Sequence, residues 1–136
     1  MIETFVCEEA PTPLGNYSVA VGCGELIFVS GTGPRDPKTN RVPGLVLNEK
    51  GERVKYDIEA ETRLTLENIQ KILVSAGSSL DRVIEVNVYL TNMSDFEAYN
   101  RVYGGYFSSH RPARTTIGVA SLPGKISIEM KVVASR

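Results

Sequence analysis

The stretch that decides the fold is a pair of alternating runs near the C-terminus, RTTIGVA (114–120) and ISIEMKVVA (126–134). Polar and apolar residues alternate in these runs, which is typical of strands with one covered face. Because only a short turn separates them, the pattern predicts that the two strands are neighbours in one sheet. The first run begins with Arg114, and the second contains one carboxylate, Glu129. Such a pair indicates either an exposed polar face or a site that binds an anion.

The second of these strands is partly apolar on both faces. One face carries Ile126, Ile128, Met130 and Val132, and the other carries Ser127, Glu129, Lys131 and Val133. If helices cover the first face, the second is left half-apolar and open. A small sheet of this kind commonly packs against another subunit, so an oligomer is expected.

The rest of the chain predicts a single α+β domain that spans residues 1–136. Alternating or β-branched runs predict strands at 2–7, 18–22, 26–31 and 83–90, and a hairpin within 45–56 that turns at Gly51. Segments with several prolines and glycines predict loops at 10–17 and 32–44. The order of strands, helix, strand, helix and two strands predicts a mixed sheet with two helices on one face.

The first helix is predicted over 57–76, because apolar residues recur there at steps of three and four. Asp57 is its expected N-cap and Gly77 its expected C-terminal stop. The second helix is expected to open with a capping box of Ser94 and Glu97. Its predicted buried stripe contains one polar residue and consists of Phe96, Asn100, Tyr103 and Phe107. The amide of Asn100 needs hydrogen-bond partners there, because an unpaired buried amide costs stability.

Composition and charge argue against several classes of function. The 15 basic and 16 acidic side chains give a net charge of −1, so nothing drives the chain toward nucleic acid or an anionic membrane. No apolar run is long enough to span a bilayer, and the N-terminus lacks a secretory signal pattern, so a cytoplasmic protein is expected. One histidine, His110, supplies neither a zinc site nor a hydrolytic triad, and Cys7 and Cys23 are expected to be free thiols.

Five segments resemble the RidA (YjgF) family of reactive-intermediate deaminases, in order and over nearly the whole chain. They are APTPLGNYSVAV, LIFVSGTGP, the run from ETRLTLENIQ to YNRVYGGYF, RPARTTIGVASLP, and ISIEMKVVA. The resemblance implies a fold like that of the bacillus-type chorismate mutase, assembled as a homotrimer with three clefts between subunits. It also implies a cofactor-free hydrolysis of the 2-enamine or 2-imine of a small carboxylic acid to a 2-keto acid and ammonia.

The same resemblance assigns roles to particular residues. Arg114 matches the arginine that binds the substrate carboxylate, a task suited to its planar, bidentate guanidinium. Glu129 matches the glutamate that positions or activates water, and desolvation in a cleft is expected to raise its pKa, partly offset by Arg114. Tyr17 matches a tyrosine that lines the cleft, although it could equally be a packed loop aromatic. The remaining matches are the backbone of Gly31, the helix residues Phe96 and Asn100, and the hydroxyl or N–H of Thr116.

Some positions depart from the archetypal pattern of the family. Thr32 replaces a glutamine, Thr116 replaces a frequent cysteine, Asn16 replaces a proline, and the segment 32–56 is longer. Thr32, Thr116 and the longer segment resemble the branch that includes 2-aminomuconate deaminase. Three functions therefore stay open from the sequence: a general imine deaminase, a 2-aminomuconate deaminase, and a member that binds a small carboxylate without catalysis or acts on RNA.

Overall fold

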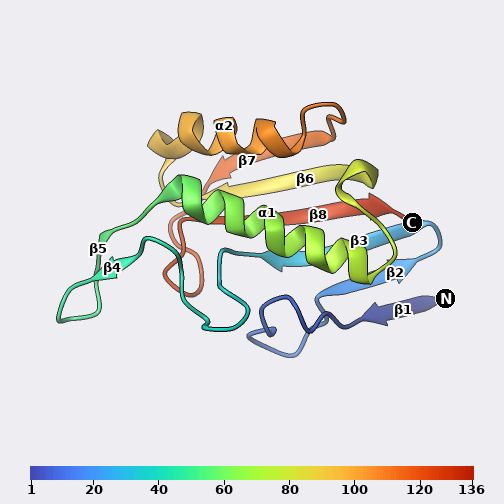
Figure 1. The fold of residues 1–136 in the computed structure, drawn as a ribbon, viewed down its shortest axis with the longest axis horizontal. Helices are drawn as coiled ribbons and strands as arrows, with labels where there is room; N and C mark the ends of the chain where they lie inside the picture. Colours follow the sequence, from blue (N-terminus) through green and yellow to red (C-terminus); the bar gives the residue numbers. More distant parts are fainter.

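The computed structural model describes residues 1–136, which form one sheet with two helices packed on one of its faces (Figure 1). The sheet strands are β1 (Ile2–Phe5), β2 (Ala20–Cys23), β3 (Leu26–Thr32), β6 (Val83–Leu90), β7 (Ala113–Gly118) and β8 (Ile128–Ser135). A separate hairpin pairs β4 (Val46–Leu47) with β5 (Arg53–Lys55), and the helices are α1 (Ile58–Ser75) and α2 (Phe96–Tyr106). Short 3₁₀ helices cover Leu80–Arg82 and Met93–Asp95.

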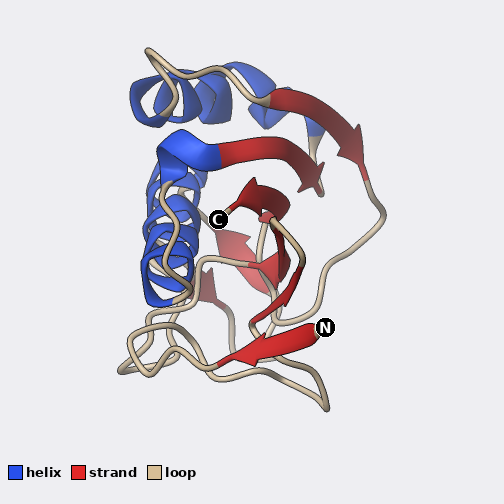
Figure 2. Cartoon of the chain, turned by 90° about the vertical axis from the view of Figure 1, so that its right-hand side faces the viewer, coloured by secondary structure: helices blue, strands red, loops and turns tan.

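The strands lie in the order β1-β2-β3-β8-β6-β7, and only the β6–β7 pair is parallel. Figure 2 shows both helices on the same side of the sheet. The predicted α+β class, with a mixed sheet and two helices on one face, is therefore confirmed. Neither helix is long and apolar enough to cross a membrane.

The prediction that the last two strands are neighbours is wrong, because β6 lies between them. The chain leaves β6, passes through α2 and returns beside β6 as β7, which is the crossover that a parallel pair requires. The loop after β7 then crosses the end of β6 and delivers β8 to the centre of the sheet. There β8 pairs with both β3 and β6, and its residues that face the helices are fully buried: Ile128, Met130, Val132 and Ala134.

The first helix forms as predicted. The Asp57 carboxylate accepts a hydrogen bond from the Ala60 N–H at 3.0 Å, which satisfies one free donor of the first turn. Gly77 follows the helix with a φ of 81°, in the left-handed region that favours glycine. Leu66 and Leu73 on its inner face are completely buried against the sheet.

The second helix begins differently from the prediction. The side chain of Asn92 accepts a hydrogen bond from the Ser94 N–H at 3.0 Å, so Asn92 caps a 3₁₀ turn and the α-helix starts only at Phe96. The expected capping box of Ser94 and Glu97 does not form. The buried stripe is also shifted, because Tyr99 is completely buried and Asn100 is exposed. The large apolar ring of Tyr99 gains more from burial than an amide would.

The second face of the sheet carries exposed apolar side chains. Leu26 and Phe28 on β3 and Ile117 on β7 retain 37%, 41% and 46% of their accessible surface. Val133 lies directly opposite Phe28, so apolar groups adjoin across the strands. The sequence-based expectation of a half-apolar open face is confirmed. The two cysteines are free, with Cys7 half-buried and Cys23 exposed.

A buried carboxylate fixes the start of β8 against α1. Glu61 is completely buried and accepts hydrogen bonds from the N–H and hydroxyl of Ser127, at 2.7 and 2.9 Å. The guanidinium of Arg53, from the β4–β5 hairpin, donates to the Ser127 hydroxyl and to the Ile126 carbonyl. Burial raises the pKa of Glu61, and the bonds from Ser127 oppose this rise without cancelling it. Helix, hairpin and central strand therefore meet at one polar group.

This raised pKa predicts how stability depends on pH. The folded chain holds the Glu61 proton more tightly than the unfolded chain, so this group makes stability decline as pH rises above about 4.3, the ordinary glutamate value. Glu61→Gln keeps the shape and removes the titration. Urea unfolding at pH 4, 5.5 and 7 should therefore show the variant gaining stability relative to wild type as pH rises. Glu67→Gln is the control on the same helix. If the free energy of unfolding of Glu61→Gln differed from that of wild type by the same amount at all three pH values, the account would be contradicted.

Candidate active site

The first group of predicted site residues surrounds Arg114 on the helix-covered side of the sheet. Arg114 pairs with Val86, which is completely buried, so its side chain points beneath α2. Its Nη1 donates to the Oδ1 of Asn100 at 2.8 Å. Asn100 is exposed, so its amide does not need this bond for stability, and the bond instead holds the guanidinium. The predicted residues Arg114 and Asn100 are thus brought together, one from β7 and one from α2.

Aromatic rings complete the surroundings of this guanidinium. Its Cζ lies 4.7 Å from the ring centroid of Tyr103, 5.4 Å from that of Tyr99 and 5.8 Å from that of Phe96. Such contacts hold a cation by attraction to the ring faces. Thr116, on the same face of β7, shares a 2.5 Å hydrogen bond with the hydroxyl of Tyr99. The cation is therefore held in place by rings and neutral acceptors.

The charge of Arg114 has no anionic partner within the chain. The two ion pairs of the structure are Arg101–Glu59 and Arg136–Glu3, and neither includes Arg114. Burial raises the pKa of Tyr103 to about 12, so this hydroxyl stays neutral and does not compensate the cation. A fixed guanidinium without a carboxylate neighbour is a ready site for the carboxylate of a ligand.

The second group of predicted residues lies on the open side of the sheet. Glu129 pairs with Tyr89, which alternates with the buried Val88 and Leu90, so Glu129 faces away from the helices. Glu129 is half-buried, and burial raises its pKa. No neighbouring cation offsets this rise, so the predicted influence of Arg114 on this pKa is absent within one chain.

Gly31 lets the Glu129 carboxylate lie against the backbone of β3. The pairing of β3 with β8 shifts register between Val29 and Thr32, and Gly31 lies in this irregular stretch. A Cβ at Gly31 would clash with the Glu129 carboxylate oxygen and lie only 3.1 Å from its Cδ. The glycine is thus required by close approach, and its φ lies outside the left-handed region.

Tyr17 and Glu129 line the same open hollow. The Tyr17 hydroxyl accepts a hydrogen bond from the Leu14 N–H at 3.1 Å, and 47% of the Tyr17 surface is exposed. The hollow is lined by parts of three segments that are far apart in sequence, among them Tyr17, Gly31, Arg35, Ile126, Glu129 and Lys131. No group of three or more His, Cys, Asp or Glu side chains is arranged to hold a metal ion.

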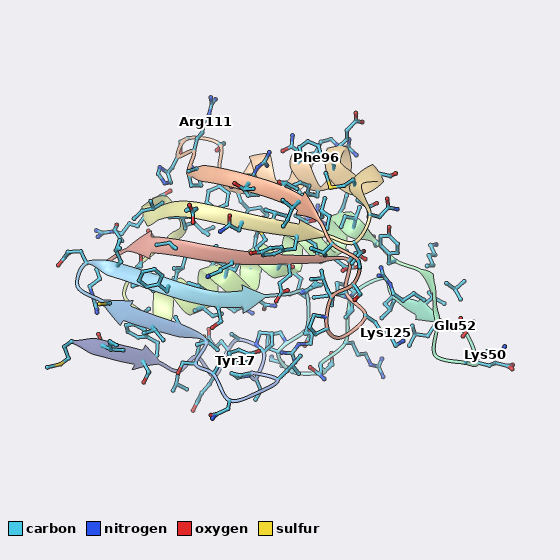
Figure 3. The ribbon with its side chains drawn as sticks, turned by 180° about the vertical axis from the view of Figure 1, so that it is seen from behind. Tyr17, Lys50, Glu52, Phe96, Arg111 and Lys125 are labelled. Carbon is cyan, nitrogen blue, oxygen red and sulfur yellow. The ribbon has the colours of Figure 1, made fainter.

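The two groups do not meet within one chain. Arg114 points to the helix-covered face and Glu129 to the open face, and strand β6 separates their strands. In Figure 3, Phe96 of the first group and Tyr17 of the second lie at opposite margins of the sheet. The sequence-based pairing of Arg114 and Glu129 is therefore corrected, and we call the two groups the arginine half-site (Phe96, Asn100, Arg114, Thr116) and the glutamate half-site (Tyr17, Gly31, Glu129).

Sequence reasoning did not assign to the site four side chains that adjoin these half-sites. Tyr99 and Tyr103 surround Arg114, and the aromatic positions at steps of three and four after Phe96 carried the signal for them. Arg35 and Lys131 line the glutamate half-site. The position of Arg35 depends on the path of a loop, for which the sequence contains no periodic pattern.

Comparison with known proteins decides the family. Residues 7–136 match the family described as Endoribonuclease L-PSP. A RutC family protein of Pyrococcus horikoshii is 44% identical over 134 residues, covering 98% of this chain and 98% of that protein. The chain belongs to the RidA (YjgF) family.

Solved structures agree with this assignment. Escherichia coli TdcF, crystallised with bound serine, superposes with a TM-score of 0.86 and 31% identity over 98% of both chains. The YjgF gene product of Escherichia coli gives the same TM-score and identity over 98% of both chains. The full TdcF sequence, which is named provisionally as a reactive intermediate deaminase, is 33% identical over 100% of this chain and 96% of its own length. RidA family members thus carry both deaminase and endoribonuclease names.

The contact between Gly31 and Glu129 yields a prediction. Gly31→Ala should leave this RidA family member folded but push the Glu129 carboxylate out of its half-buried position. The pKa of Glu129 should then fall toward the ordinary glutamate value, because burial is what raises it. A carbon-13 NMR titration of the Glu129 carboxyl group measures this shift. Gly104→Ala, where an added Cβ meets nothing within 4 Å, is the matched control.

The same substitution can be checked through stability. Forcing the Glu129 side chain off its rotamer to avoid the new methyl group should cost about 0.5–1.5 kcal/mol. This cost should vanish in a Glu129→Ala background, where the new methyl group has room. An equal cost in both backgrounds, or an unchanged Glu129 pKa, would show that the contact is unimportant.

Proposed function

We propose that this chain is a cofactor-free hydrolytic deaminase that converts the 2-imine or 2-enamine of a small carboxylic acid to a 2-keto acid and ammonia. The observation that carries the proposal is a fixed, unpaired guanidinium in one half-site and a half-buried carboxylate of raised pKa in the other. The deaminase name of TdcF supports this reaction, and the serine bound to TdcF supports a small carboxylate ligand.

The arginine half-site binds and orients the substrate in this proposal. The Arg114 guanidinium pairs with the carboxylate next to the reacting carbon, and Asn100 and the rings of α2 keep it from turning away. Thr116 offers a hydroxyl two residues along the same face. Orientation is a large part of the task, because a well-placed reactant avoids the entropic cost of a chance encounter.

The glutamate half-site moves protons. An enamine first shifts a proton from nitrogen to carbon and becomes the imine. Water then adds its oxygen to the imine carbon while Glu129 accepts one of its protons and passes that proton to the imine nitrogen, which gives a neutral carbinolamine. The hydroxyl proton of the carbinolamine next moves through Glu129 to the amino group, the C–N bond breaks as the C=O bond forms, ammonia leaves, and Glu129 is again a carboxylate. One water is consumed for each ammonia, and no electrons are gained or lost.

The separation of the half-sites motivates a homotrimeric assembly. Strands two positions apart lie roughly 10 Å from each other, and the two side chains also point to opposite faces. A small carboxylic acid cannot contact both within one chain. We therefore propose that the arginine half-site of one subunit faces the glutamate half-site of the next, in three clefts of a chorismate-mutase-like trimer. The exposed apolar side chains of the open sheet face support such packing.

Binding without catalysis is less well supported by the geometry. A site that only binds an anion gains nothing from a half-buried carboxylate, which repels the ligand. The near-neutral net charge does not favour RNA, because phosphate contacts require clustered lysine and arginine.

Ammonia release from 2-imino acids, which an amino acid oxidase generates in the assay, tests the proposal directly. 2-Aminomuconate and a single-stranded RNA are tested as alternative substrates. Imine hydrolysis no faster than in protein-free buffer would overturn it.

The role of Glu129 leads to a prediction for Glu129→Gln. The amide preserves the shape of the half-site but cannot accept a proton from water, so kcat should fall about 10²–10⁴-fold. Affinity for an unreactive 2-keto acid should change little. Because a base must be deprotonated, wild-type activity should decline as pH falls through the raised pKa of Glu129, and the variant should lack this acidic limb. An equal kcat in both proteins, with chemistry rate-limiting, would remove Glu129 from the mechanism.

A further inference from the structure

Two cations line the same hollow as Glu129, and neither is used by the reaction described above. Arg35 comes from the loop after β3, and Lys131 lies two residues after Glu129 on β8. Neither belongs to either ion pair of the structure. Glu129 is the one acidic side chain among the residues that line the hollow, beside these two cations. The hollow therefore contains positive charge in excess of what the chain itself compensates.

Arg35 is held rigidly at the wall of this hollow. Its Nη2 donates to the Thr12 carbonyl at 2.8 Å, and its Nη1 donates to the Asn40 side-chain oxygen at 2.6 Å. Both acceptors are neutral, so they fix the guanidinium without cancelling its charge. A guanidinium has five N–H donors, and these two bonds leave three for a ligand. Arg35 also lines a smaller hollow that adjoins Tyr17 and Gly31.

The arrangement repeats the chemistry of the arginine half-site. Arg114 and Arg35 are each fixed by neutral acceptors and are each without a carboxylate partner. Arg114 belongs to the arginine half-site, and Arg35 lines the hollow of the glutamate half-site. A substrate with a single carboxylate would use only one of them.

We propose that Arg35, assisted by Lys131, binds a second carboxylate of the substrate, so that the preferred substrates are imines or enamines of dicarboxylic acids. This inference rests on the proposed function, because it assigns the first carboxylate to Arg114 and the reacting carbon to the space near Glu129. The distal carboxylate forms charge-assisted hydrogen bonds with the free N–H groups of Arg35. Lys131, which is exposed, adds attraction at longer range.

A purely structural role for Arg35 makes a different prediction. Its two hydrogen bonds join the loop that carries Tyr17 to the loop at 32–44. If this were its whole role, loss of the side chain would loosen both loops and weaken every ligand to a similar extent. Recognition of a distal carboxylate instead changes the preference between ligands of equal length and different charge.

Binding of two unreactive keto acids to the intact protein separates these roles. Calorimetry compares 2-oxoglutarate with 2-oxohexanoate, which has a similar length and no distal charge. Wild type should prefer 2-oxoglutarate, and Arg35→Met should lower the preference ratio about 10–100-fold, the value of a charge-assisted contact. Arg35→Lys should restore part of it. Arg41→Met, an exposed arginine of the same loop, is the control and should leave both affinities unchanged.

The outcomes distinguish this inference from the proposed function. A preference ratio that is unaffected by Arg35→Met, or a wild-type protein that prefers 2-oxohexanoate, would overturn the dicarboxylate assignment even if imines are hydrolysed. Absence of imine hydrolysis with an intact, Arg35-dependent preference for 2-oxoglutarate would instead overturn the proposed reaction and leave a dicarboxylate-binding site. Kinetics on the corresponding imines should show the same ratio in kcat/KM.

Discussion

The position of β8 between β3 and β6 constrains the whole molecule. Each residue of this strand must face either the two helices or the open side, because side chains alternate along a strand. The residues that face the helices form the centre of the core, and this fixes Glu129 on the opposite side. The parallel return of β7 beside β6 fixes Arg114 on the helix side in the same way. The register of three strands thus determines which reactive groups can share a site and which cannot.

The polar groups that serve the site are arranged around this framework. Glu61 and Arg53 hold the start of β8 at Ser127, two residues before Glu129, so the catalytic candidate inherits a well-defined position. Gly31 has no side chain, whereas a Cβ at this position would displace the Glu129 carboxylate. On the other side, the rings of α2 and Asn100 fix a guanidinium whose charge nothing in the chain neutralises. Under the proposed function, each half-site is incomplete by itself, so one folded chain would contain the residues of the active site without bringing them together.

Local patterns allowed much of the fold to be predicted from the sequence. Asp57 and Gly77 bounded α1, and alternation identified most strands, because caps and side-chain periods depend only on neighbouring residues. The predicted pairing of β7 with β8 was wrong. Strand order depends on where the chain re-enters the sheet after α2, and local patterns do not contain this information. The predicted start of α2 was wrong because Asn92, and not Ser94, provides the capping side chain, and it caps a 3₁₀ turn that precedes the helix. The predicted site residues could be named from the family resemblance, whereas their division between two faces depended on register.

The central claim is that a complete site requires the arginine half-site of one subunit and the glutamate half-site of another. Mixing subunits tests it most directly: Arg114→Ala and Glu129→Gln chains, each carrying a different tag, are coexpressed and the mixed oligomers are isolated. Either variant alone should retain about 1% of wild-type imine hydrolysis or less. In a head-to-tail trimer that contains both variants, one of the three clefts combines an intact arginine half-site with an intact glutamate half-site, whichever variant is present twice. Recovery of about a third of wild-type activity in the isolated mixed oligomers is the predicted result, and mixed oligomers as inactive as the single variants would contradict the account.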